Sequence, residues 1–268
     1  MLKDITLGQF FPGNTVAHRL DPRTKILLVT LYIVALFCAK HVVSYGLMAL
    51  TLFACVKISK VRFKTMVRGL KPVVFIVVFT AILNLFFTPG ERDLVKLGFL
   101  RISDTGLENA IFMVLRILLL IMGTFLMTYT TSPISLTDGL ERLLNGLKKV
   151  RVPVHELAMM MSIALRFIPT LIEETDKIMS AQKARGADFE SGSLLDKAKA
   201  LIPILVPLFI SAFRRADELA TAMECRCYHG GEGRTKLHVL KYQKRDYIAL
   251  TCGGVILAAV LVLRKFGL

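Results

Sequence analysis

The sequence predicts an all-α integral membrane protein with about five transmembrane helices and two or three long amphipathic cytoplasmic helices between the fourth and fifth spans. Three observations predict this fold class. Apolar residues gather into separate blocks, a long charged segment divides the last two blocks, and lysine and arginine concentrate in certain connecting segments. The apolar blocks are 26–39, 42–56, 73–87, 107–131 and 247–263, and the charged segment is 132–245.

The overall composition agrees with a membrane protein. The 268 residues are 54% hydrophobic and carry a formal net charge of +15. Basic residues collect in the cytoplasmic loops of membrane proteins, where anionic lipid attracts them. Since no nucleic-acid-binding motif accompanies the charge, we expect the partner to be the lipid bilayer and not nucleic acid. The first 25 residues lack the apolar core and cleavage site of a signal peptide.

The first two apolar blocks are separated only by Lys40 and His41. A single helix over residues 26–56 would be about 46 Å long, whereas the hydrocarbon core of a bilayer is about 30 Å thick. It would also place a lysine near the bilayer centre, at a cost of about 2.5–3.5 kcal/mol. We therefore predict a hairpin of two short, tilted spans that turns at these two residues.

Charge in the connecting segments predicts the topology. The N-terminal segment and residues 57–71 are basic, which places both inside the cell. Residues 87–106 balance three basic against three acidic side chains, as an outer loop does. The last span would place the C-terminus outside, although Arg264 and Lys265 count against that step. Three regions follow: an N-terminal transmembrane region (1–131), a cytoplasmic coupling-helix domain (132–245) and a C-terminal transmembrane helix (246–268).

The charged segment contains three helical patterns, over residues 130–150, 152–186 and 191–228. These helices are too apolar to be solvated alone and too charged to span the bilayer. We expect them to lie at the inner membrane surface, packed on one another. The alternative is a small soluble cytoplasmic domain, but that does not explain why residues 201–210 are apolar on nearly all sides.

No catalytic, cofactor or metal site is predicted. The five histidines are scattered, and the chain has no H-E-x-x-H, no G-x-S-x-G and no phosphate-binding G-x-x-x-x-G-K-[ST] motif. Cys225, Cys227 and His229 lack a nearby fourth ligand for structural zinc. Arg116 lies in the fourth span, where a charge is a functional candidate, but we favour a structural role inside the bundle. An integral-membrane enzyme is therefore the least supported class.

One polar pattern occurs twice, 41 residues apart. "DKIMSAQKARG" ends at Gly186 and "DELATAMECRC" ends at Cys227, and both patterns carry an arginine as their second-to-last residue, Arg185 and Arg226. Helix capping explains a single arginine, since a cation near a C-terminus gains about 0.3–1 kcal/mol from the helix dipole. It does not explain the recurrence. A repeated surface indicates a repeated partner, such as two homologous subunits that each receive one helix tip through the arginine fork.

Several stretches together closely resemble the transmembrane T component (EcfT) of energy-coupling factor transporters. These are "FFPGNTVAHRLDPRTKI", "TTSPISLTDGLERLL", "LRFIPTLIEETDKIMSAQKARGADF" and "RRADELATAMECRCYHGGEGRT", and the resemblance covers nearly the whole chain. It implies a non-catalytic, multi-pass subunit of a prokaryotic cell membrane, with its N-terminus and coupling helices in the cytoplasm. It also implies two kinds of partner for vitamin or trace-nutrient uptake: a pair of cytoplasmic ATP-binding subunits (EcfA-type) that hydrolyse ATP, and an interchangeable, membrane-embedded S component.

The resemblance also implies the docking residues. Ala184, Arg185 and Gly186 match the family's Ala-Arg-Gly motif, which docks a groove on an ATPase. The second motif departs from it, since cysteines stand where alanine and glycine are usual and only the arginine is kept; its residues are Cys225, Arg226 and Cys227. A methionine run suits a surface that accommodates different S components, with core packing as the alternative; its residues are Met159, Met160 and Met161.

An alternative function is the permease subunit of an ordinary ABC importer. Such a permease also docks ATPases through cytoplasmic helices, but commonly through one E-A-A…G loop, whereas this chain carries two related helix endings. The sequence does not name the nutrient, and it does not say whether the two ATPases are identical or which arginine meets which of them.

Overall fold

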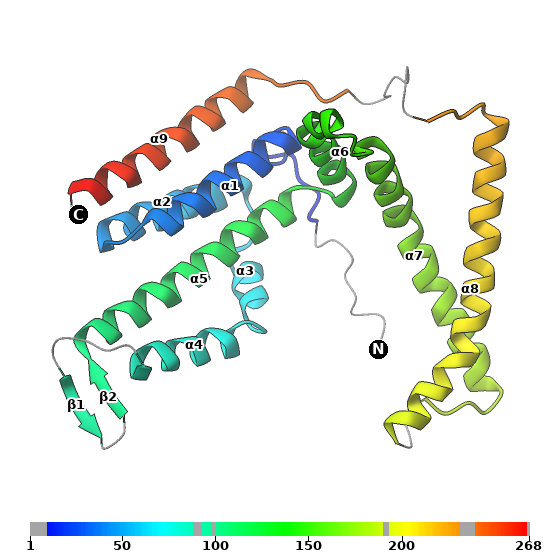
Figure 1. Ribbon diagram of the computed structural model, residues 1–268, viewed down its shortest axis with the longest axis horizontal. Helices are drawn as coiled ribbons and strands as arrows, with labels where there is room; N and C mark the ends of the chain where they lie inside the picture. The colour runs from blue at the N-terminus through cyan, green and yellow to red at the C-terminus, as the bar shows by residue number, and fades with distance from the viewer. Residues whose placement is uncertain (1–9, 88–92, 98–99, 190–192, 231–238, 267–268) are drawn as a thin grey trace. The chain divides into compact units, whose positions relative to one another are not determined.

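The computed structural model describes residues 10–87, 93–97, 100–189, 193–230 and 239–266 (Figure 1). The chain divides into two compact units. Within the ranges just given, the bundle unit comprises residues 10–140 and 240–266, and the two-helix unit comprises residues 141–239. The bundle unit contains α1 (Pro22–Cys38), α2 (Val42–Ser59), α3 (Phe63–Leu70), α4 (Val74–Phe87), β1 (Asp93–Leu97), β2 (Leu100–Ser103), α5 (Asp104–Thr130), most of α6 (Pro133–Leu144), and α9 (Lys244–Phe266). The two-helix unit contains the 3₁₀ helix η2 (Asn145–Val150), α7 (Val154–Ala184) and α8 (Leu194–Cys225).

The all-α membrane class is confirmed. Within the described residues, four helices are long and apolar enough to cross a membrane, and the pair α3 and α4, bent by 62°, makes a fifth span if it is counted as one. The four are α2, α5, α7 and α9. The antiparallel pair of short strands β1 and β2 is an addition within the expected outer loop. α7 meets the length and composition of a span as well, so its predicted cytoplasmic position stays a prediction.

The predicted break between the first two apolar blocks is confirmed. α1 ends at Cys38 and α2 begins at Val42, so the turn covers residues 39–41 and includes the two residues expected from the sequence. Arg116 of α5 holds this turn, because its Nη2 donates to the Ala39 carbonyl (3.3 Å) and its Nε donates to the Tyr45 hydroxyl (3.0 Å). Ala39 is fully buried, and a buried carbonyl at a helix end needs such a donor. The geometry thus gives the charged residue of the fourth span a structural role.

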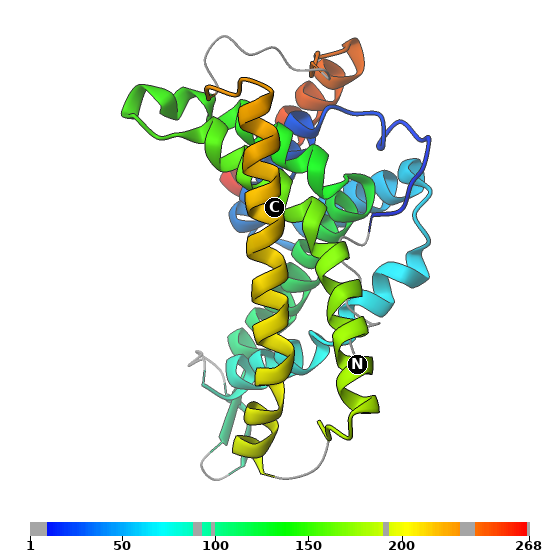
Figure 2. The ribbon, with the colours of Figure 1, turned by 90° about the vertical axis from the view of Figure 1, so that its right-hand side faces the viewer.

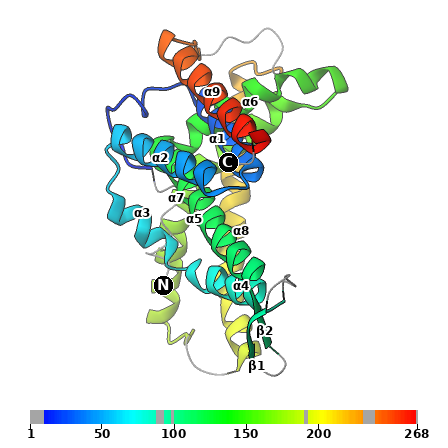
Figure 3. The same ribbon diagram turned by 90° about the vertical axis from the view of Figure 1, so that its left-hand side faces the viewer.

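The core of the bundle unit is formed by five helices. Figure 3 shows α9 lying along α1, and the two helices are in contact, as are α1 with α5 and α2 with α5. The last span therefore packs against the first. The largest fully buried apolar side chains come from α1, α2, α3, α5 and α9 in turn; they are Leu36, Met48, Met66, Tyr129 and Val260.

A buried cluster of charges joins the start of α1 to the start of α9. The Asp21 side chain caps α1 by accepting from the Arg23 backbone N–H (2.9 Å), and the Asp21 backbone N–H donates to the buried Asp246 carboxylate (2.8 Å). Burial opposes ionisation of Asp21, but the hydrogen bonds and charge of Arg23 outweigh it and hold the pKa of this carboxyl below its usual value. The cluster fixes the two helix starts side by side.

Candidate functional site

The two-helix unit is a pair of long helices that run in opposite directions (Figures 1 and 2). The Glu174 carboxylate accepts hydrogen bonds from the Ser211 hydroxyl and from Arg215 Nη2, the latter at 3.1 Å. The Arg215 guanidinium also lies 5.7 Å from the centre of the Phe167 ring. Further along, Gln182 Nε2 donates to the Pro203 carbonyl at 3.5 Å. We call Glu174, Ser211 and Arg215 the clasp.

The clasp joins α7 and α8 at equivalent positions of the repeated pattern. Glu174 of α7 and Arg215 of α8 are 41 residues apart, which is the offset of the repeat, and Ser211 lies one helical turn before Arg215. From the Glu174–Arg215 pair each helix continues for 11 residues to its arginine, which is about 16 Å at 1.5 Å per residue. Because the helices are antiparallel, the two arginines lie at opposite ends of the pair.

The first helix end is a Schellman motif. α7 ends at Ala184, Arg185 is the C-cap, and Gly186 takes the left-handed conformation with φ +88°. The Gly186 N–H donates to the Lys183 carbonyl, and the Ala187 N–H donates to the Gln182 carbonyl, both at 3.0 Å. These two bonds satisfy carbonyls that the helix leaves without a partner, and glycine adopts the required φ freely. The local sequence therefore ends the helix directly after the arginine.

The second helix end has the same backbone without a glycine. α8 ends at Cys225, Arg226 is the C-cap, and Cys227 occupies the left-handed position with φ +54°. The Cys227 N–H donates to the Glu224 carbonyl at 2.8 Å, and the Tyr228 N–H donates to the Met223 carbonyl at 3.1 Å. The sequence did not predict this turn, because the left-handed conformation costs a residue with a Cβ about 1–2 kcal/mol. The structure shows that the cysteine adopts it.

Both helix tips expose their arginines. Ala184, Arg185 and Gly186 are exposed, and so are their counterparts Cys225, Arg226 and Cys227. Among the described residues, neither guanidinium forms an ion pair with a carboxylate of this chain. Two planar donor groups are thus presented at separate points, each at the end of a rigid helix, as two docking points for carboxylates or backbone carbonyls require.

The two tips are not brought together into one site, and the part of the chain that the structure describes holds no cluster of three His, Cys, Asp or Glu side chains that could bind a metal ion. The methionine run lies near the start of α7, where Met160 and Met161 are about half-exposed and Met159 is partly buried. The middle of α8 also exposes large apolar side chains on several sides; they are Leu201, Ile202, Leu205, Val206, Phe209, Ile210 and Phe213.

Sequence reasoning missed the clasp. Its signal lay in the repeat, because Glu174 and Arg215 are themselves 41 residues apart and thus occupy equivalent positions with opposite charge. Two residues further on, both patterns have an aspartate, Asp176 and Asp217. Opposite charges at equivalent positions of a duplicated helix are what an antiparallel pair related by a near two-fold axis needs at its crossing.

Comparison with known proteins identifies relatives of this sequence. A family model described as cobalt transport protein (CbiQ) matches residues 13–237. The energy-coupling factor transporter transmembrane protein EcfT of Clostridium kluyveri is 55% identical over 266 residues, covering 99% of this chain and 98% of the relative. The proteins of the same name from Acidaminococcus fermentans and Bacillus subtilis are 52% and 48% identical, over 99% and 97% of this chain and 97% and 98% of theirs.

Proposed function

This chain belongs to the family of energy-coupling factor transporter transmembrane proteins, EcfT, and from that membership we propose that it couples two cytoplasmic ATP-binding subunits to a membrane-embedded, substrate-binding S component. ATP is hydrolysed in the partner subunits, and this chain transmits the motion. The N-terminus and residues 132–245 lie in the cytoplasm of a prokaryotic cell in this proposal. The substrate class is a vitamin or trace nutrient, chosen by the S component.

The observation that carries the proposal is the pair of matching helix tips. Arg185 and Arg226 sit on backbone turns with the same hydrogen bonds, both are exposed, and each lies 11 residues beyond the Glu174–Arg215 pair at the crossing of α7 and α8. A single docking point needs one such tip. Two tips at opposite ends of an antiparallel pair match two similar subunits lying side by side, each of which receives one arginine.

The clasp supports a mechanical role. When ATP binding draws the two ATPase subunits together, each docked tip moves with its subunit. A freely hinged pair of helices would absorb this motion, but the Glu174–Arg215 ion pair and the Ser211 hydrogen bond tie the helices at the crossing. The motion then passes to the opposite half of each helix, which is the half that carries the exposed apolar residues.

The S component docks on those apolar residues in our proposal. Large exposed apolar patches mark interaction or membrane-facing surfaces. The methionine run, Met159–Met161, and the apolar middle of α8 are such surfaces. Flexible, polarisable methionines pack against partners of different shape, as an interchangeable S component requires.

Affinity purification of the tagged chain from its native membrane tests the proposal. We expect two ATP-binding subunits, or two copies of one, together with more than one substrate-binding membrane protein across preparations. A chain that always carries a single dedicated binding protein, with no second membrane partner under any growth condition, would act as an ordinary permease instead.

A further inference from the structure

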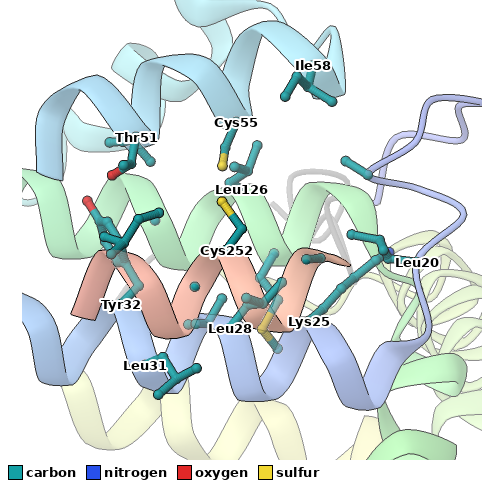
Figure 4. Close-up of a pocket in the computed structure, with 18 of the residues that line it drawn as sticks. Leu20, Lys25, Leu28, Leu31, Tyr32, Thr51, Cys55, Ile58, Leu126 and Cys252 are labelled. Carbon is teal, nitrogen blue, oxygen red and sulfur yellow. The ribbon is translucent and has the colours of Figure 1, made fainter. Parts of the chain in front are cut away.

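The bundle unit contains an apolar cavity of about 620 Å³ that the proposed coupling does not use. It lies between α1, α2, α5 and α9 (Figure 4). A cavity needs only about 10–15 Å³ to hold a water molecule, but this one offers water almost no polar partner. The residues that line it include Leu20, Leu28, Tyr32, Cys55, Leu126 and Cys252.

Two glycines allow close helix packing along one wall of the cavity. A Cβ at Gly253 of α9 would lie 2.6 Å from Leu28 Cδ2, and a Cβ at Gly123 of α5 would lie 2.6 Å from Tyr32 Cε1. α1 therefore packs closely on both helices at these points. α2 forms the opposite wall, and Figure 4 shows the side chains of Cys55 and Cys252 directed toward each other across the open space.

The length of the cavity matches one leaflet of a bilayer. Along α1 the lining runs from Lys25 to Ala35, and along α9 it runs from Arg245 to Ile256. These stretches are about 15–16 Å long at 1.5 Å per residue. Half of a hydrocarbon core of about 30 Å is about 15 Å. With its charged end at one membrane surface, a cavity of this length would reach the bilayer centre.

The surface end of the cavity carries positive charge. Lys25 and Arg245 line it there, and Lys57 lies at the same end of α2, beside the lining residue Ile58. Lys25 Nζ donates to the Thr130 carbonyl (2.8 Å) and to the His18 carbonyl (3.3 Å). An ammonium group has three donors, so one remains. Arg245 is exposed. Two acids of the neighbouring cluster, Asp21 and Asp246, offset part of this charge.

We propose that this cavity binds one acyl chain of an anionic phospholipid, with the lipid phosphate held at the cavity mouth by Arg245 and Lys25. The apolar lining contacts the acyl chain, and the two cations bind the phosphate of the headgroup. A transmembrane helix of a partner fits less well. A helix carries no phosphate for the cations at the mouth, and the variants below distinguish the two occupants. This lipid site is independent of the proposed coupling and holds for the chain without its partners.

The test is a lipid titration of the purified full-length chain, followed by native mass spectrometry. Phosphatidylglycerol and phosphatidylcholine with the same acyl chains are compared, and inorganic phosphate serves as the headgroup-only probe. We expect one tightly held phosphatidylglycerol and no displacement by phosphate. Near a membrane surface one arginine or lysine is worth about 1 kcal/mol, so phosphatidylglycerol should be preferred about 5-fold or more. Equal retention of the two lipids, or displacement by phosphate, overturns the proposal.

Two pairs of variants locate the site. Cys252→Phe fills the cavity and should remove the retained lipid, whereas Val255→Phe, at an exposed position of the same helix outside the lining, should keep it. Arg245→Gln should reduce the preference for phosphatidylglycerol several-fold, and Lys244→Gln, exposed but outside the lining, should not. The Arg245 pair keeps the test decisive if Cys252→Phe folds poorly.

A partner helix in the cavity would give a different result. Cys252→Phe would then keep its phosphatidylglycerol and lose a membrane protein that copurifies with the unaltered chain. Unchanged lipid binding in both Cys252→Phe and Arg245→Gln would also contradict the site.

Discussion

The ends of α7 and α8 have the same backbone and different residues around it. Both helices finish with an arginine at the C-cap followed by a left-handed residue and two Schellman hydrogen bonds. At the first end the left-handed residue is Gly186, and at the second it is Cys227. The residues next to the arginine therefore differ between the two tips, whereas the backbone turn that carries it is the same. The comparison indicates that both tips place their arginine at the same position on the helix end, whatever residues surround it.

The exchange of glycine for cysteine has an energetic consequence. A left-handed non-glycine residue is disfavoured by about 1–2 kcal/mol, so the second turn is held less firmly than the first. Helix ends fray at a low free-energy cost, so a difference of this size changes how often the end opens. We expect the backbone turn at the α8 tip to be less stable than the turn at the α7 tip. Once docked, Arg226 should contribute as much binding energy as Arg185.

The largest expected effect comes from removing both arginines. Truncation of one member of a buried charge pair typically costs about 2–5 kcal/mol, which is at least about 30-fold in affinity. Arg185→Ala with Arg226→Ala should thus abolish copurification of the ATP-binding subunits, and each single variant should weaken it or uncouple ATP hydrolysis from uptake. Lys177→Ala and Arg214→Ala remove exposed cations elsewhere on the same helices and serve as controls. Normal assembly and uptake in the double variant would end the docking account.

The next effect concerns the clasp that links the two tips. Glu174→Gln leaves the Arg215 guanidinium without its carboxylate at a partly buried contact, at a cost of about 1–2 kcal/mol. We expect the complex to assemble with both ATPases but to hydrolyse more ATP for each substrate molecule imported. The combination Glu174→Arg and Arg215→Glu should restore part of the coupling. Unchanged transport per ATP in Glu174→Gln would show that the crossing transmits no motion.

The smallest expected effects come from substitutions at the left-handed residues of the two turns. Gly186→Ala places a Cβ in open space, so only the left-handed backbone opposes it, and the tip should lose about 1 kcal/mol. Cys227→Gly should stabilise the second tip by a similar amount. Hydrogen exchange of the full-length chain measures both, as faster exchange after Arg185 in the first variant and slower exchange after Arg226 in the second. Opposite signs would mean that the two turns are not equivalent.

Much of the fold could be predicted because the membrane simplifies the problem. A span must be apolar for a fixed length, and a lysine inside an apolar stretch forces a turn, which placed the α1–α2 hairpin at Lys40 and His41. The duplicated pattern likewise predicted two arginine-bearing helix ends. Gly186 predicted the first turn, but no residue preference predicts a cysteine in the left-handed position of the second.

The remaining features depend on contacts distant in sequence. The clasp joins residues of two helices whose direction and crossing point composition does not encode. Arg116 had no visible partner because its acceptors are a carbonyl and a hydroxyl 77 and 71 residues away. The cavity has a wall closed by tight contacts at two glycines and a wall lined by α2, an arrangement that only the packed bundle defines.

Cross-linking from each tip tests the central claim most directly. The α8 tip already carries exposed Cys225 and Cys227, and Ala184→Cys provides an equivalent thiol at the α7 tip once the other cysteines are replaced. A short thiol-reactive photo-cross-linker attached at either tip, in the assembled complex, should capture an ATP-binding subunit, and the adduct should be lost when the adjacent arginine is changed to alanine. Capture of only the S component or of lipid from either tip, with no ATP-binding subunit, would contradict the account.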